Sequence, residues 1–167
     1  MIKAVVFDLD HTLFDRYETL RLVVPMFREK FRLNPDITDE YFAKELIWAD
    51  KNYVHRGWNE IFAHLIKCKI FEDVPTFEEY EAFMISCFKR VAVKYPFAIP
   101  TLEKVRKMGY KTGLITNSDT HVQERKLEML DLYSYLDEIV ISGSTPYRKP
   151  QKEIFQLFQN SFILLVR

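Results

Sequence analysis

The sequence predicts an α/β fold in which a helical segment interrupts a small parallel sheet after its first strand. A short apolar run at residues 2–7 ends in polar residues, as buried strands do. Residues 15–96 contain helical periodicities and no credible strand. From residue 97 onward, helical and strand patterns alternate, which is typical of β-α-β units with right-handed crossovers.

The first predicted strand ends in two carboxylates, Asp8 and Asp10, at the edge where parallel sheets bind ligands. If the strand continues through Asp10, both side chains leave it on one face, because strand side chains alternate with a period of two. Two neighbouring carboxylates repel each other unless a cation joins them, and oxygen ligands favour Mg²⁺. The pair indicates a Mg²⁺ site, although a lone Asp-x-Asp is more often a helix cap followed by a solvated acid.

The composition is that of an ordinary globular protein. The 167 residues are 48% hydrophobic and 29% charged, with a formal net charge of zero, which argues against nucleic acid or an anionic membrane as the main partner. No apolar run is long enough to span a bilayer, and the N-terminus has no signal pattern, so we expect a cytoplasmic protein. Cys68 and Cys87 lie in helical patterns without His or Cys partners at metal-binding spacing, so we expect buried thiols.

Residues 15–96 are expected to form a small helical bundle. Apolar residues recur at helical intervals in four stretches, and Pro25 should kink or divide the first helix. Thr38 is expected to begin the second helix. Thr76 followed by Glu79 has the spacing of a capping box for the fourth. The many aromatic residues of this segment are expected to form its core.

Two further strands are expected at residues 111–115 and 138–141. Thr116 and Asn117 follow the first of these, and Lys149 lies in the loop after the second. In a parallel sheet these side chains share one edge with the two acids. A nucleophilic carboxylate, a hydroxyl-amide pair and a lysine are the groups that phosphoryl transfer through an aspartyl-phosphate uses. Taken singly, Thr116-Asn117 is more often a cap or turn, and Lys149 a solvated lysine.

These residues resemble three motifs of the haloacid dehalogenase superfamily of phosphohydrolases. Residues 8–13 match the first motif, Asp-x-Asp-x-Thr-Leu. Residues 114–117 match the second, a strand ending in Thr or Ser, and Lys149-Pro150 matches the third. The resemblance covers residues 1–158, and three motifs in this order with a helical insertion are highly specific.

The resemblance implies a fold and a domain organisation. Residues 1–14 and 97–167 would form a Rossmann-like, three-layer α/β core with a parallel sheet, and residues 15–96 would form an inserted helical cap. It also implies hydrolysis of a small phosphorylated metabolite through an aspartyl-phosphate, with Mg²⁺ as the cofactor. Cap residues set the substrate in this family, so the sequence leaves the substrate and the oligomeric state open.

Carried over residue by residue, the resemblance implies a role for each site residue. Asp8 would be the nucleophile and a metal ligand, and Asp10 the general acid and base, with its backbone carbonyl also meeting the metal. Thr116 would hydrogen-bond the phosphoryl oxygens, and Asn117 would help to position them. Lys149 would offset the negative charge on Asp8 and on its phosphorylated form. An acid at position 10 favours a phosphatase over a dehalogenase.

The chain departs from the family at a fourth motif, a strand ending in Gly-Asp with a further Asp a few residues on. No acid follows Glu153. Residues 162–166 could be a fourth strand or a foreign tail, and without a fourth strand residues 2–7 would be an exposed edge. Mg²⁺ sites depend on a few carboxylates, so we expect impaired activity. The second hypothesis is therefore a silent or truncated family member that binds a phosphorylated ligand or a protein partner.

Overall fold

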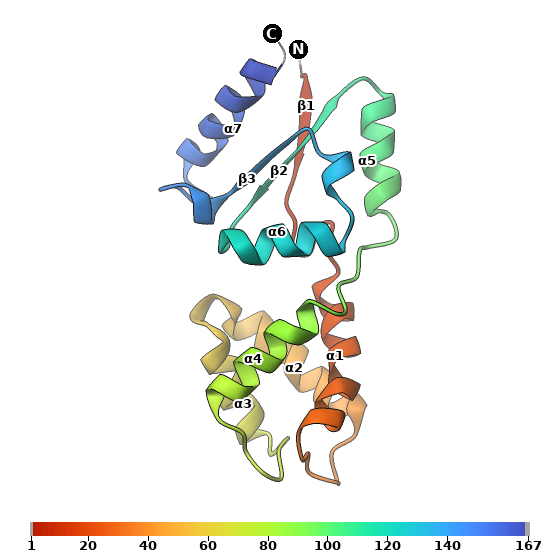
Figure 1. Ribbon diagram of the computed structural model, residues 1–167, viewed down its shortest axis with the longest axis vertical. Coiled ribbons are helices and arrows are strands. Elements are labelled where there is room, and N and C mark those ends of the chain that lie inside the picture. Colours follow the sequence, from red (N-terminus) through yellow and green to blue (C-terminus); the bar gives the residue numbers. More distant parts are fainter. Residues whose placement is uncertain (1, 166–167) are drawn as a thin grey trace. The chain divides into compact units, whose positions relative to one another are not determined.

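The computed structural model describes residues 2–165 of the chain (Figure 1). Contacts divide the chain into two units. Met1–Arg16 and Ala92–Arg167 form the first, called here the α/β unit, and Tyr17–Val91 forms the second, called the helical unit. The expected role of the helical unit as a cap stays a prediction. Across the described residues, every helix is too short or too polar to cross a membrane.

The α/β unit is built on a three-stranded parallel sheet in the order β1-β2-β3. The strands are β1 (Ala4–Phe7), β2 (Lys111–Thr116) and β3 (Glu138–Ile141). Val6 pairs with Gly113 across the first ladder, and Ile115 pairs with Val140 across the second. The prediction of an α/β fold with a parallel sheet is confirmed.

Helices lie on both sides of this sheet (Figure 1). They are α5 (Ala98–Lys107), α6 (Thr120–Met129) and α7 (Lys152–Leu165). α7 contacts β2 and β3, and α5 contacts β2 from the other side. Gly113 allows this close approach of α7, because a Cβ atom there would lie 2.2 Å from the Phe158 ring. The loops that carry the site residues follow the carboxyl ends of these strands, which is where parallel sheets bind ligands.

β1 lies at one edge of the sheet and is more exposed than the buried strand that the sequence predicts. It begins at Ala4 and ends at Phe7, and Val6 is 41% exposed. Within the described residues, only β2 pairs with it. The prediction of a buried first strand is therefore wrong, whereas the expected exposed edge is present in this part of the chain.

The loop after β3 leads to a last helix, which the sequence predicts for residues 151–159, and the observed helix is longer. α7 continues through Leu165, so the alternative of a fourth strand at residues 162–166 is wrong for its described part, and Val166 lies outside the described residues. The reason is packing, because Phe158 and Phe162 lie one helical turn apart and stack with ring centroids 5.9 Å apart. Both rings pack against the sheet with Ile154, and the helical period therefore continues through them.

The helical unit consists of four α-helices, which confirms the expected bundle. They are α1 (Arg16–Lys30, whose first residue belongs to the α/β unit), α2 (Asp39–Tyr53), α3 (Trp58–Lys67) and α4 (Phe77–Phe88). α1 runs through Pro25 without division. Thr38 caps α2 by accepting a hydrogen bond from the Tyr41 backbone N–H. Thr76 and Glu79 form the predicted capping box of α4.

Aromatic side chains form the centre of the helical unit, as expected. Phe27 is fully buried, with the Phe42 and Phe83 rings edge-on at 5.2 and 5.0 Å. Phe62 and Tyr80 stack with centroids 4.7 Å apart. Edge-to-face and offset pairs of this kind add to the stabilisation that burial of the rings provides.

Candidate active site

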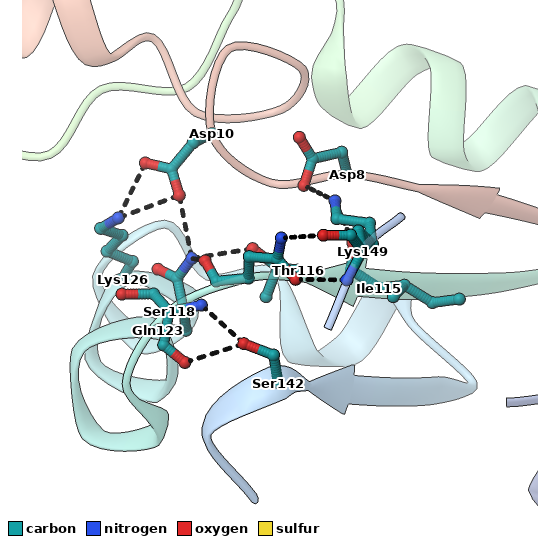
Figure 2. Close-up of polar contacts among 10 residues, drawn as sticks. Asp8, Asp10, Ile115, Thr116, Ser118, Gln123, Lys126, Ser142 and Lys149 are labelled. Atoms are coloured by element: carbon teal, nitrogen blue, oxygen red, sulfur yellow. Dashed lines mark hydrogen bonds and ion pairs between the residues drawn. The ribbon is translucent and has the colours of Figure 1, made fainter. Parts of the chain in front are cut away.

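The carboxyl ends of β1 and β2 bring the first site residues together (Figure 2). Asp8 directly follows β1, Thr116 ends β2, and Lys149 reaches them from the loop before α7. Lys149 Nζ donates to Asp8 Oδ1 at 2.5 Å and to the Ile115 carbonyl at 2.8 Å. The structure therefore joins two residues that lie 141 positions apart in the sequence. The Asp8 side chain remains 41% exposed, so a ligand has access to it.

Asn117 holds the backbone of the lysine loop. Its Nδ2 donates to the Lys149 carbonyl at 3.0 Å, and its Oδ1 accepts from the Lys149 backbone N–H at 2.8 Å. Both ends of the side-chain amide are therefore used within the protein. We propose that Asn117 acts as a positioning residue for Lys149, in place of the direct role toward the phosphoryl oxygens that the family resemblance implies.

Asp10 has a different set of partners from Asp8. Lys126 Nζ donates to its two oxygens at 2.8 and 3.1 Å, and Gln123 Nε2 donates to Oδ2 at 2.9 Å. Arg16 lies 3.8 Å from Oδ1. Lys126 and Arg16 are both buried, and Asp10 provides each of them with an opposite charge.

These cations decide the protonation state of Asp10. Burial by itself would raise the pKa of its carboxyl, but the charges of Lys126 and Arg16 and the hydrogen bonds from Gln123 and Lys126 outweigh it. The net effect holds the pKa of Asp10 below its ordinary value of 3.8. Asp10 is therefore a carboxylate in the resting protein at neutral pH.

The two acids do not share one face of a strand. β1 ends at Phe7, so Asp8 and Asp10 both lie in the loop that follows. The same-face prediction required the strand to continue through Asp10, and it does not. Each carboxylate instead contacts a lysine of its own, Asp8 with Lys149 and Asp10 with Lys126 (Figure 2). Charge repulsion between the acids is therefore relieved by protein cations from two elements.

Thr116 presents a hydroxyl whose hydrogen is directed by Gln123. Gln123 Nε2 donates to Thr116 Oγ1 at 2.8 Å and also to the Asn117 carbonyl at 3.1 Å. A hydroxyl that accepts in this way still has its own O–H to donate. Thr116 can therefore offer a hydrogen bond to an anionic oxygen, the chemistry that its family motif implies.

The loops that follow β2 and β3 are also joined to each other. The Ser118 backbone N–H donates to Ser142 Oγ at 3.1 Å, and Ser142 Oγ–H donates to the Ser118 carbonyl at 3.4 Å (Figure 2). Asp119 then begins α6 by accepting from the His121 backbone N–H. This anchoring fixes the start of α6, which carries Gln123 and Lys126 toward Asp10.

The donor set fits a hard cation such as Mg²⁺, with few ligands. Carboxylate and carbonyl oxygens suit Mg²⁺, which commonly uses one or two carboxylates together with substrate phosphate. Asp8 and the Asp10 backbone provide such oxygens. In the described residues, however, no further Asp, Glu, His or Cys completes a three-ligand group with Asp8 and Asp10, and no acid follows Glu153 in the sequence.

Three residues around Asp10 are missing from the predicted site. Arg16, Gln123 and Lys126 lie within ion-pair or hydrogen-bond distance of Asp10, and none of them belongs to the three motifs. The spacing of two of these residues is visible in the sequence, since Gln123 and Lys126 lie three apart on α6 and therefore share a helix face. That this face meets Asp10 depends on the tertiary fold, which the spacing alone does not specify.

The ion pairs of Asp10 predict a pH-dependent stability. Asp10→Asn should lower the free energy of unfolding by about 1–3 kcal/mol at pH 7, because the ion pairs of the Asp10 carboxylate with buried Lys126 and Arg16 are lost. The folded-state pKa is lowered, so this contribution is present above pH 3.8 and is lost as the pH falls through the folded-state value. Urea denaturation of both proteins at pH 7 and near pH 3 measures it, and an equal difference at the two pH values would contradict the ion-pair assignment.

Comparison with known proteins identifies the family. A model of the haloacid dehalogenase-like hydrolases matches residues 2–161. A glyceraldehyde 3-phosphate phosphatase from Methanopyrus kandleri is 32% identical over 93% of this chain and 68% of its own length. The pyrophosphatase PpaX from Bacillus cereus is 24% identical over 93% of this chain and 66% of its own length. A solved structure described as a dehalogenase has a TM-score of 0.66 at 20% identity, over 96% of this chain and 71% of that one.

The chain belongs to the haloacid dehalogenase-like hydrolase family. This is the family that the three motifs resemble, so that identification is confirmed. The chain is thus a hydrolase of a family in which both named relatives are phosphatases. The likeness to the solved structure supports the fold alone.

Proposed function

We propose that the chain is a Mg²⁺-dependent phosphatase in which Asp8 attacks a small phosphorylated metabolite. The observation that carries the proposal is the contact of Lys149 Nζ with Asp8 Oδ1, beside Thr116 at the carboxyl ends of β1 and β2. A carboxylate, a hydroxyl donor and a fixed cation at one point can bind a phosphoryl group and offset the charge that develops on it. The alternatives, a helix cap for Thr116 and a solvated loop position for Lys149, do not explain why these side chains meet at Asp8.

The reaction would proceed in two displacements. An Asp8 oxygen bonds to phosphorus as the bond to the leaving oxygen breaks, and the leaving oxygen takes a proton from Asp10. Water then attacks phosphorus as its bond to the Asp8 oxygen breaks, Asp10 takes a proton from that water, and phosphate and free Asp8 result. Because Asp10 is ionised at rest, its proton must arrive with the substrate. An incoming phosphate adds negative charge beside Asp10, which raises the proton affinity of the Asp10 carboxylate and favours its protonation.

Mg²⁺ would be held by Asp8 and the Asp10 backbone carbonyl. When bound, it would supply positive charge to the transferring phosphoryl oxygens. Lys149 offsets the remaining charge from the opposite loop, and the Thr116 hydroxyl donates to one phosphoryl oxygen. With so few carboxylates in this part of the chain we expect weak metal binding and impaired turnover.

Hydrolysis of p-nitrophenyl phosphate, with and without Mg²⁺, tests the function. We expect turnover below roughly 1 s⁻¹, a low value for an enzyme, and its loss when EDTA removes the metal. Glyceraldehyde 3-phosphate and pyrophosphate are the next substrates to compare, because the relatives are named for them. Turnover of about 1 s⁻¹ or more would contradict the expected impairment, and turnover unaffected by EDTA would contradict the metal dependence.

A silent family member that binds a phosphorylated ligand or a protein partner is the second candidate. The small number of acids at the site and the engagement of Asp10 by Lys126 favour it. Calorimetric binding of inorganic phosphate with no hydrolysis of any phosphorylated substrate would select this alternative. The cytoplasmic location and the absence of a nucleic-acid or membrane partner stay predictions from the sequence.

A further inference from the structure

A second cluster of chemically active side chains lies within the helical unit. Glu45 of α2 and His64 and Cys68 at the end of α3 meet there, and all three are only partly exposed. Glu45 Oε2 lies 2.9 Å from His64 Nε2 and 3.5 Å from Cys68 Sγ, and Sγ lies 3.3 Å from Nε2. The expectation that Cys68 is buried and has no His partner at metal-binding spacing is therefore wrong. His64 stands four residues before it, one turn away on the same helix face.

Two edges of the triangle formed by the three ligand atoms have the length that a tetrahedral metal ion requires. Bond lengths of about 2.0–2.3 Å to nitrogen, oxygen and sulfur place neighbouring ligand atoms roughly 3.3–3.6 Å apart. The two edges that end at the Cys68 sulfur measure 3.3 and 3.5 Å, and the 2.9 Å edge between Glu45 Oε2 and His64 Nε2 is a hydrogen-bond distance that a bound metal would lengthen. We propose that Glu45, His64 and Cys68 bind one divalent transition-metal ion, Zn²⁺ in the first instance. The site is independent of the proposed phosphatase function.

The arrangement does not suit a cysteine nucleophile. In a Cys-His-acid triad the acid contacts one ring nitrogen and the thiol contacts the other, so that the acid orients the base. Here Glu45 Oε2 and Cys68 Sγ both face the same nitrogen, Nε2 of His64. One nitrogen, one sulfur and one oxygen that converge on a common point are instead the pattern of a metal site.

Rigid elements hold the ligands in place. The Cys68 backbone N–H donates to the His64 carbonyl at 2.9 Å, which continues the α3 ladder through the cysteine. Trp48 of α2 stacks on the His64 ring with centroids 4.6 Å apart and an interplanar angle of 25°. The ring plane is therefore fixed from the helix that also carries Glu45. A site built on two packed helices in this way is preorganised.

The ligand types select the metal. A thiolate and an imidazole favour Zn²⁺ and similar transition metals, whereas Mg²⁺ prefers oxygen ligands. Three protein ligands leave the fourth tetrahedral position for water or another group. The Tyr41 side chain lies near Cys68 at the edge of the site, since each of the two groups affects the pKa of the other.

Binding at this cluster should release a proton. Burial, followed by the neighbouring Glu45 carboxylate, raises the pKa of the Cys68 thiol. The groups that face this thiol are Glu45 and Tyr41 from α2 and His64 from α3. The metal must displace the thiol proton, so affinity should increase as the pH rises through the neutral range.

Co²⁺ and Zn²⁺ titrations of the full chain test the proposal. Co²⁺ should give a thiolate charge-transfer band that saturates at one ion per chain, and Cys68→Ser should remove this band. The matched control is Cys87→Ala, because Cys87 is a fully buried thiol whose pKa burial raises to about 11. This control should keep the band.

Competition for Zn²⁺ with a chromophoric chelator measures the affinity. Cys68→Ser and His64→Ala should each weaken binding by at least about 100-fold, and Asp8→Asn by less than about threefold. Glu45→Gln keeps the size and the hydrogen-bonding capacity of the side chain, so this variant is expected to fold normally. It should still weaken Zn²⁺ binding at least about tenfold. Circular dichroism checks that each variant is folded. Equal Zn²⁺ affinity in the parent and in folded Cys68→Ser or Glu45→Gln, or a cobalt complex without the charge-transfer band, would overturn the proposal.

Discussion

Asp8→Asn is expected to abolish hydrolysis of p-nitrophenyl phosphate, with a loss in kcat/KM of at least about 10⁴-fold where the parent rate allows it to be measured. An amide cannot act as the nucleophile that forms an acyl phosphate, yet it is nearly the same size as the carboxylate. Its carbonyl oxygen can still accept the hydrogen bond from Lys149. The substitution therefore removes the chemistry and leaves the contacts of the site largely in place.

A matched change outside the site separates this effect from a general one. Asp73→Asn makes the same substitution at a side chain that is 72% exposed in the helical unit, and it should leave kcat/KM unchanged. Steady-state kinetics and circular dichroism of the two variants complete the comparison. If Asp8→Asn kept the parent rate while folded, the nucleophile would have to be another residue.

Lys149→Met is expected to lower kcat by about 10²–10³-fold, the usual cost of losing one group that stabilises developing charge. Lys149 Nζ contacts the Asp8 oxygen. Its positive charge therefore stabilises most strongly the state in which negative charge builds up on the transferring phosphoryl group. Methionine fills a similar volume without the ammonium group. The Ile115 carbonyl also loses its donor, so a modest fall in stability should accompany the kinetic change.

Lys152→Met is the control for this second variant. Lys152 is exposed at the start of α7, three residues beyond Lys149, and its loss should not alter kcat. Saturation kinetics distinguish the expected fall in kcat from an effect on KM alone. A rise in KM with unchanged kcat would mean that Lys149 contributes only to substrate binding, and the proposed charge compensation during transfer would be wrong.

Local patterns were sufficient to locate most of the elements. β3 coincides with residues 138–141, and β2 extends the expected residues 111–115 by one. The capping residues Thr38 and Thr76 act through neighbours three residues away, so they are visible in the sequence alone. The same is true of the three motifs, since each is a short run of neighbouring residues.

Features that depend on distant partners could not be predicted in this way. The ionic partners of Asp10 come from α6 and from Arg16, and only the folded sheet brings them together. The apolar run after residue 161 is short enough to be strand or helix, and the packing of Phe162 on the sheet decides for helix. The His64–Cys68 spacing is readable in the sequence, but Glu45 completes the cluster from another helix.

Fluorine NMR of beryllium fluoride binding, with Mg²⁺ present, tests the central claim that Asp8 accepts the phosphoryl group, whether or not the chain turns over. BeF₃⁻ imitates a phosphoryl group bonded to a carboxylate. The parent chain and Asp10→Asn should both show a bound fluoride signal, while Asp8→Asn should show none. A bound signal that persists in Asp8→Asn, or that disappears only in Asp10→Asn, would contradict the assignment of Asp8 as the acceptor.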